Sequence, residues 1–318
     1  MTRRLLLVAF ALSLVIGCGD EAAPQKEANS AGPKRPSRSA PIDGGVHDGQ
    51  SPSGTSLPVD AGAPIDPFAC TLDTRTVYLQ DGKKIESITA RGSYWSRTLD
   101  PDGTATEGVG FPRSLLDEPK MASGPCAGQD VCLLDARTVY FDGTKKVESI
   151  FAYGRYFNWG FDANGAVVPN AAYPQLIEET AALANGPCAG QASGACLIDT
   201  RSLYFEGGVK IESMTAQGRF WEHRIGVDGT RSPTGAHGRV LEEIPRLANG
   251  PCKGRAGGAC TLDTRAVYID FDGTKTEEIT AYGRYWAYRL APDGTVLDVV
   301  ADAIRLETIP RFVGPCAG

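Results

Sequence analysis

Short runs in which apolar and polar residues alternate recur along the chain from residue 70 onward. In the run at 85–90, a strand would place Glu86 and Ile88 on one face of a sheet, because side chains alternate along a strand. Turn pairs such as Asp81-Gly82 separate these runs, and both residue types tolerate the positive φ of tight hairpins. The pattern predicts short antiparallel strands joined by tight turns, and therefore an all-β fold.

The same succession of runs occurs four times, which indicates internal repeats. The copies open with CTLDTRTVY, CLLDARTVY, CLIDTRSLY and CTLDTRAVY, and each closes with GPCAG or GPCKG. We predict four tandem, disulfide-stapled antiparallel β-meander modules at 68–128, 130–190, 194–254 and 258–318. A closed four-bladed propeller is the alternative arrangement of the same modules.

Eight of the nine cysteines belong to the modules, two in each, and paired cysteines in an exported chain indicate disulfides. Pairing within each module is favoured, because the spacing inside the modules is constant whereas the linkers vary in length. This scheme gives Cys70–Cys126, Cys132–Cys188, Cys196–Cys252 and Cys260–Cys316. The other scheme joins neighbouring modules through Cys126–Cys132, Cys188–Cys196 and Cys252–Cys260, and leaves Cys70 and Cys316 to close a ring.

The first 17 residues have the pattern of an export signal. Two arginines precede an uncharged apolar run at 5–16, which is shorter than the roughly 20 residues of a membrane-spanning helix. The motif VIGC, which ends at Cys18, resembles the lipobox of bacterial lipoproteins. The resemblance implies that the signal peptide 1–17 is removed and that Cys18 carries a membrane-anchoring lipid. Because Gly19 rather than an aspartate follows, the outer membrane or cell surface is slightly favoured.

Composition narrows the remaining possibilities. Residues 18–67 form the lipidated N-terminus and a tether that is rich in proline and glycine and poor in bulky apolar residues, a composition typical of disorder. The formal net charge of −6 argues against a nucleic-acid partner. No cofactor and no metal are expected, because the chain has no CxxC motif, no phosphate-binding glycine loop and no histidine that recurs between modules.

Charged residues recur at fixed positions of the modules. An aspartate stands two residues before an arginine, and a glutamate follows in the next strand. We expect a charge-assisted structural staple that ties the first segment of each module to its second strand, rather than a carboxylate pair for acid–base catalysis. The residues are Asp73, Arg75 and Glu86; Asp135, Arg137 and Glu148; Asp199, Arg201 and Glu212; and Asp263, Arg265 and Glu277.

Aromatic pairs on the predicted third strands suggest a binding surface. Neighbouring residues on a strand face opposite ways, so one ring of each pair points outward, beside an arginine in three modules. Such an Arg–aromatic strip could bind an envelope polysaccharide or a protein, and packing between modules is the alternative explanation. The candidate binding residues are Trp95, Arg155, Phe157, Arg219, Trp221, Arg284 and Trp286.

The leading functional prediction is a non-catalytic, membrane-anchored envelope lipoprotein whose modules serve binding or scaffolding. The alternative from another class is an exported hydrolase with its site in the third module, around Glu222, His223 and His237. No catalytic constellation recurs between the modules, which favours the first prediction.

Two segments also resemble a known family. AYGRYWAYRL at 281–290 and GFPRSLL at 110–116 are similar to the strand and the connection of hemopexin-type blades. The resemblance implies a ligand-binding, four-bladed propeller closed by one disulfide between its first and last blades. The modules here are longer than those blades, and each carries its own pair of cysteines, which departs from the family pattern.

Overall fold

The computed structural model describes residues 69–101 and 103–317. They belong to a unit that spans Ser56–Gly318, and the other unit, Met1–Thr55, lies outside the described residues. The predicted signal peptide, Cys18 and the tether therefore lie outside the described residues. Within those residues, no helix is long and apolar enough to cross a membrane.

Each repeat folds into one antiparallel sheet followed by a short 3-10 turn and a short helix, and we number these units blades 1 to 4. Blade 1 contains β1 (Thr74–Gln80), β2 (Lys83–Ala90), β3 (Ser93–Leu99), β4 (Ala105–Glu107), β5 (Arg113–Ser114), η1 (Leu115–Asp117) and α1 (Pro119–Ala122). Blade 2 contains β6 (Ala136–Asp142), β7 (Lys145–Ala152), β8 (Arg155–Phe161), β9 (Val167–Pro169), β10 (Gln175–Leu176), η2 (Ile177–Glu179) and α2 (Ala181–Ala184).

The other two blades repeat the plan. Blade 3 contains β11 (Thr200–Glu206), β12 (Val209–Ala216), β13 (Arg219–Ile225), β14 (Arg231–Pro233), β15 (Arg239–Val240), η3 (Leu241–Glu243) and α3 (Pro245–Ala248). Blade 4 contains β16 (Thr264–Ile269), β17 (Lys275–Ala281), β18 (Arg284–Leu290), η4 (Leu306–Thr308) and α4 (Pro310–Cys316). Its outer strand is continuous, β19 (Val296–Arg305), whereas the other blades have two short outer strands that both pair with the third strand.

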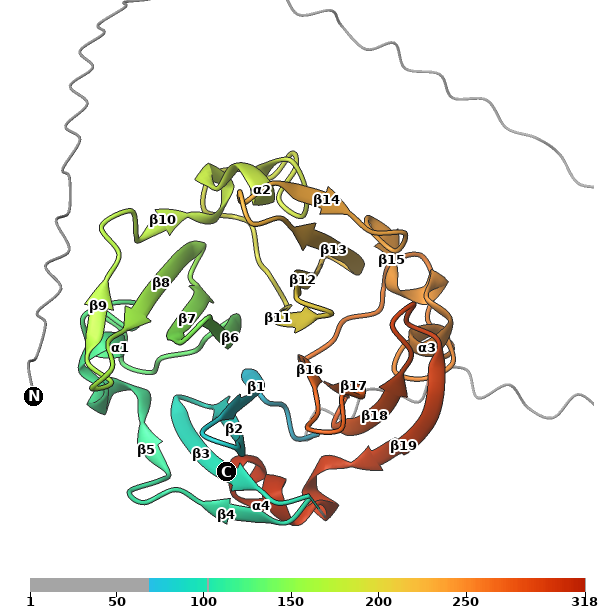
Figure 1. Ribbon diagram of the computed structural model, residues 1–318, viewed down its shortest axis with the longest axis horizontal. Helices are drawn as coiled ribbons and strands as arrows, with labels where there is room; N and C mark the ends of the chain where they lie inside the picture. The colour runs from blue at the N-terminus through green and yellow to red at the C-terminus, as the bar shows by residue number, and fades with distance from the viewer. Residues whose placement is uncertain (1–68, 102, 318) are drawn as a thin grey trace, which may run out of the picture. The chain divides into compact units, whose positions relative to one another are not determined.

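The four sheets form a closed ring. The first strands of the blades, β1, β6, β11 and β16, lie innermost and next to one another around the centre, and the short outer strands lie at the rim (Figure 1). The all-β class and the repeated meanders are confirmed. The modules close into the four-bladed propeller that the sequence left as the alternative arrangement.

The disulfides correct the favoured pairing. The cysteines join neighbouring blades through Cys126–Cys132, Cys188–Cys196 and Cys252–Cys260, and Cys70–Cys316 closes the ring. In blades 1 to 3 the closing cysteine follows the helix, and the next blade begins only a few residues later, so the two sulfur atoms meet across the linker. The constant spacing within a module therefore reflects the constant length of a blade and not a bond inside it.

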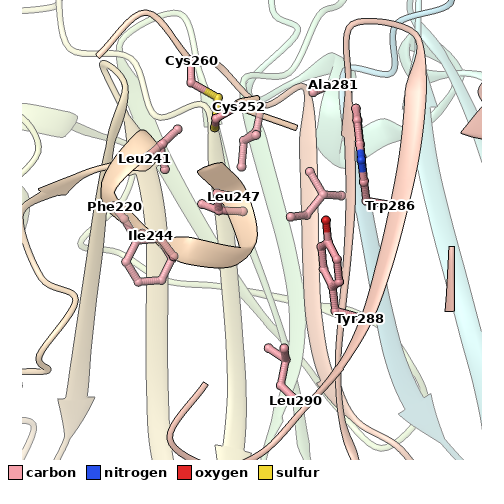
Figure 2. Packing of buried hydrophobic residues seen from close by; sticks show 12 residues of the cluster. Phe220, Leu241, Ile244, Leu247, Cys252, Cys260, Ala281, Trp286, Tyr288 and Leu290 are labelled. Atoms are coloured by element: carbon pink, nitrogen blue, oxygen red, sulfur yellow. A yellow bond between two sulfur atoms is a disulfide. The ribbon is translucent and has the colours of Figure 1, made fainter. Parts of the chain in front are cut away.

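The hydrophobic cores lie between blades, which explains why the modules form a ring. One cluster combines Phe220, Leu241 and Leu247 of blade 3 with Trp286 and Tyr288 of blade 4. Figure 2 shows Leu247 between Leu241 and the two rings of blade 4. Three similar clusters combine blades 4 and 1, blades 1 and 2, and blades 2 and 3. Each blade thus buries its apolar face against its neighbour, and a separate module would expose it to water.

Candidate functional site

The repeated arginine and glutamate meet in every blade. The Arg75 side chain donates to Glu86 over 2.7 Å, and the equivalent pairs in blades 2 to 4 have distances of 2.6 Å between nitrogen and oxygen. The three further pairs are Arg137–Glu148, Arg201–Glu212 and Arg265–Glu277. These side chains are almost fully buried, so the pairs tie the first strand of each blade to its second strand.

A second cation reaches each buried glutamate, and sequence reasoning missed it. Three of these cations come from the helix of the preceding blade: Lys120 to Glu148, Arg246 to Glu277, and Arg311 to Glu86. Burial raises the pKa of Glu277, but Arg246 and Arg265 outweigh burial and hold this pKa at about 2. The available signal was a basic residue after the recurring proline, in Pro119-Lys120, Pro245-Arg246 and Pro310-Arg311.

The blade 2/3 interface departs from this arrangement. Ala182 occupies the position of the cation in α2, and Arg231 of blade 3 itself pairs with Glu212 instead. All four buried glutamates thus have two cations nearby, but in blade 3 the second cation comes from the same blade and not from the preceding one.

The repeated aspartates are not part of the staple, which corrects the prediction. Each one accepts hydrogen bonds from the backbone of the turn between the second and third strands, at a residue with φ near +52°. The acceptors are Asp73, Asp135, Asp199 and Asp263, and the turn residues are Arg91, Tyr153, Gln217 and Tyr282. Burial raises the pKa of Asp135 and Asp199 to about 6 and that of Asp263 to about 7. The carboxyls thus hold a left-handed turn conformation that is unfavourable for residues other than glycine.

These aspartates also line the passage at the centre of the ring, together with the first arginines of the blades. The passage has a volume of only about 10 Å³, which is room for one water molecule. No group of three or more His, Cys, Asp or Glu side chains among the described residues could hold a metal ion. The centre of the ring is therefore too narrow for an organic ligand.

The predicted Arg–aromatic strip does not form an accessible surface. Trp95, Phe157 and Trp286 are at most 8% exposed, and Trp221 is partly buried. The Trp rings pack against the glycine of the GPC motif in the preceding blade; the pairs are Trp95 with Gly314, Trp221 with Gly186, and Trp286 with Gly250. Arg155, Arg219 and Arg284 are exposed, but Arg219 and Arg284 each donate to a carbonyl of their own blade. The rings are buried because the blades pack face to face.

The proposed hydrolase constellation is also divided by the sheet. Glu222 lines a cleft toward blade 4, whereas Trp221 of the same strand faces Gly186 of blade 2. His223 and His237 lie on the Trp221 side, where His237 contacts both other rings. Neighbouring residues on β13 point to opposite faces, so the glutamate carboxylate and the imidazoles do not share one site.

One candidate ligand site is the cleft between blades 3 and 4, with a volume of about 850 Å³. That volume is in the range of small-molecule sites, which are mostly apolar with a few convergent polar groups. Its walls include the apolar residues Ile211, Ile244, Pro245 and Val296, the rings of Tyr204 and Tyr288, and the polar side chains of Glu206, Glu222, Arg224, Asn249, Lys275 and Asp302. The cleft forms because α3, β11 and β13 on one side and β18 and β19 on the other come from different blades.

Glu222 is the central acceptor of this blade 3/4 cleft. Thr234 Oγ1 donates to one carboxylate oxygen over 2.9 Å, and the Tyr204 hydroxyl donates to the other over 3.4 Å. Glu222 forms no ion pair among the described residues, and a carboxylate offers about four lone-pair sites, so acceptor capacity remains for a ligand. Arg224 on the same strand is exposed, and its guanidinium has no hydrogen bond within the described part of the chain, which leaves the five side-chain donors free.

A second cleft lies between blades 1 and 2 and has a volume of about 710 Å³. Its wall is richer in aromatic and proline residues, including Tyr153, Phe157, Trp159 and Tyr173, and Arg155 stands at its edge. Lys120 lines it too, but this cation already pairs with Glu148. The two clefts therefore offer different chemistry, and only the blade 3/4 cleft combines a free carboxylate acceptor with a free guanidinium.

No protein-family model matches the chain, and the search of curated proteins found no match. Solved structures do match. A hemopexin fold protein, CP4 from cow pea, is 13% identical with a TM-score of 0.54, and the match covers 76% of this chain and 95% of that one. The seed albumin LS24 from Lathyrus sativus is 9% identical with a TM-score of 0.52, covering 77% and 96%. A Cicer arietinum plant albumin showing hemagglutination is 11% identical with a TM-score of 0.51, covering 74% and 94%. These likenesses bear on the fold alone, and they show that this chain is a four-bladed, hemopexin-like β-propeller.

Proposed function

We propose that this protein is an exported binding propeller that holds a glycan of the cell envelope in the blade 3/4 cleft and is anchored to the membrane through acylated Cys18. The observation that carries the proposal is Glu222, a carboxylate in a ligand-sized cleft that, among the described residues, accepts hydrogen bonds from only two neutral hydroxyl groups. A further hydroxyl donor from a ligand would complete its hydrogen bonding.

A polyhydroxylated ligand fits the other groups of the cleft. Arg224 supplies donors for ring or glycosidic oxygens, and Asn249 keeps its side-chain oxygen free after its amide nitrogen donates to the Pro245 carbonyl. The apolar side chains of Val296 and Val299 in the wall offer a surface for the C–H face of a sugar. Lys275 already pairs with Glu206 over 3.3 Å, so the cleft has no surplus of positive charge that would select a strongly anionic ligand.

Export and anchoring rest on separate support. All eight cysteines of the propeller form disulfides, which is typical of proteins outside the cytosol. The lipobox-like motif supports the lipid anchor. One structural relative is described as a plant albumin showing hemagglutination, an activity of that protein that agrees with a glycan ligand here.

The test is glycan binding by purified protein on an array of bacterial envelope polysaccharides, peptidoglycan fragments and neutral glycans. We expect Glu222→Gln and Arg224→Ala each to weaken binding at least tenfold, about 1.4 kcal/mol. Arg155→Ala, which removes an exposed arginine from the blade 1/2 cleft, is the matched control and should bind as the wild type does. Equal losses in all three variants, or no loss in the first two, would contradict the proposed site.

A further inference from the structure

The blade 1/2 cleft has the volume of a ligand site, and the described residues that line it include no aspartate or glutamate. Its volume of about 710 Å³ lies in the range of small-molecule sites. The blade 3/4 cleft, in contrast, is lined by carboxylates such as Glu222 and Asp302. Two cations line the blade 1/2 cleft: Lys120, which pairs with Glu148, and Arg155. Arg155 is thus the lining cation without an ion pair among the described residues.

Arg155 is free because blade 2 departs from the other blades at Pro174. In blades 3 and 4 the equivalent guanidiniums donate to the carbonyls of Gly238 and Ala303 over 2.8 and 2.9 Å, and both of these residues have positive φ. The register of β10 on β8 places Pro174 at the same position in blade 2. A proline ring fixes φ at about −65°, so Pro174 cannot adopt that conformation. Arg155 is exposed, and its guanidinium has no hydrogen bond within the described part of the chain.

The ring of Tyr153 is open beside Arg155. Its hydroxyl donates to one backbone carbonyl and accepts from one backbone amide, which holds the side chain in place. The residue is nevertheless 44% exposed, and because the hydroxyl is occupied, the ring offers an apolar surface. In blade 4 the Arg255 guanidinium covers the equivalent ring of Tyr282, 3.6 Å from its centroid. Gln129 takes the place of Arg255 at the blade 1/2 interface, three residues after the closing cysteine, so no guanidinium covers Tyr153 there.

The rest of the lining combines apolar groups with one more hydrogen-bond donor. Trp159 stacks on Phe157 with a centroid distance of 5.9 Å and an interplanar angle of 24°. Its indole N–H, which can only donate, has no hydrogen-bond partner among the described residues. The apolar lining residues include Pro119, Pro125, Val167 and Pro169. A ligand that matches this cleft therefore has an apolar body and an anionic acceptor group.

We propose that the blade 1/2 cleft binds an aromatic carboxylic acid, with its carboxylate on Arg155 and its ring against Tyr153 and Trp159. The planar fork of a guanidinium matches the two oxygens of a carboxylate. One free cation also balances the single charge of a carboxylate better than the nearly double charge of a phosphate. Aromatic rings add offset or edge contacts to the burial of an aromatic ligand. This ligand differs in chemistry from the glycan proposed for the blade 3/4 cleft, so the two sites can be tested separately.

The experiment is isothermal titration calorimetry of the full-length protein with 2-naphthoate, the neutral 2-naphthamide and 2-naphthyl phosphate. We expect 2-naphthoate to bind about tenfold more tightly than either of the other two compounds. Arg155→Gln should lower the affinity for 2-naphthoate to that for 2-naphthamide and leave the affinity for the amide unchanged. The matched control is Arg219→Gln, because this equivalent arginine already donates to the Gly238 carbonyl, and it should bind all three compounds as the wild type does.

A second variant tests the ring contact. Tyr153→Gln installs the residue that blade 3 has at this turn, Gln217, which also adopts positive φ. It should weaken the binding of 2-naphthoate and 2-naphthamide alike, because the ring contact serves both compounds.

Several outcomes would overturn the site. These are equal affinities of the wild type for 2-naphthoate and 2-naphthamide, an unchanged preference in Arg155→Gln, or the same loss in Arg219→Gln as in Arg155→Gln. Tighter binding of 2-naphthyl phosphate than of 2-naphthoate would refute the match to a single charge. If Tyr153→Gln fails to fold by circular dichroism, the wild type and Arg155→Gln still decide the question.

Discussion

The disulfide that closes the ring should stabilise the protein more than any disulfide between consecutive blades. Cys70 and Cys316 are 246 residues apart, whereas the three other pairs are separated by 6 or 8 residues. In the chain-entropy treatment, removing the long cross-link costs about 5.5 kcal/mol and removing a short one about 2.5 kcal/mol. The difference arises in the unfolded chain, where the long loop excludes far more conformations than the short loops do.

The assay is equilibrium unfolding in urea of Cys70→Ser/Cys316→Ser and of Cys188→Ser/Cys196→Ser, each compared with the wild type. We expect the first double variant to lose about 3 kcal/mol more free energy of unfolding than the second. The second variant is the matched control, because it also removes two sulfur atoms at a core between blades. Equal losses would refute the reasoning, since they would show that local packing around the sulfur atoms, and not chain closure, sets the stabilisation.

Four further predictions test other parts of the structure. Trp286→Ala should cost about 3–5 kcal/mol in thermal melts, because the ring fills the core between blades 3 and 4, whereas Trp286→Phe, the residue of blade 2, should cost much less. Arg246→Ala leaves the buried Glu277 with one cation and should cost about 3–5 kcal/mol in urea unfolding, while Arg224→Ala should cost under about 0.5 kcal/mol. The raised pKa of Asp263, about 7, means that its stability contribution is complete below pH 4 and lost as the pH rises through 7, so Asp263→Asn should raise the melting temperature at pH 8 and not at pH 4. Cys18→Ser should abolish palmitate labelling and release the protein from the membrane fraction; unchanged labelling would rule out the lipid anchor.

The strands and turns could be predicted because their signals are local. Alternation at 85–90 and the glycine after each second strand specify strand and turn within a few residues, and Gly92 and its equivalents do adopt positive φ. The pairing of the cysteines could not be predicted in this way, since equal spacing is compatible with both schemes. What decides between them is that Leu247 and Trp286, which belong to different modules, share one core.

The candidate site could not be predicted from the sequence either, because its residues come from different repeats. Glu222 and Tyr204 stand in blade 3, and Tyr288 and Asp302 stand in blade 4, so no single repeat contains the cleft. Residues equivalent to Glu222 are Ser96, Asn158 and Ala287, and a departure from the repeat at this position was the one local signal. The prediction for the aspartates was wrong because they lie two residues from Arg75 and its equivalents, which suggested ion pairs. Their carboxylates instead accept hydrogen bonds from the backbone of the turn.

The origin of the second cation at each buried glutamate determines whether blades are interchangeable. In blades 1, 3 and 4, a basic residue of the helix pairs with the buried glutamate of the next blade around the ring. The helix of blade 2 has Ala182 at this position and provides no such cation. Blade 3 follows blade 2 and does not need a cation from it, because its own Arg231 pairs with Glu212. A shuffled propeller in which blade 2 precedes blade 4 would leave Glu277 with Arg265 alone, whereas blade 3 could follow any blade. Blades 2 and 3 are therefore matched as neighbours. Duplicated or exchanged blades in this chain would fold more readily when blades 2 and 3 are kept adjacent.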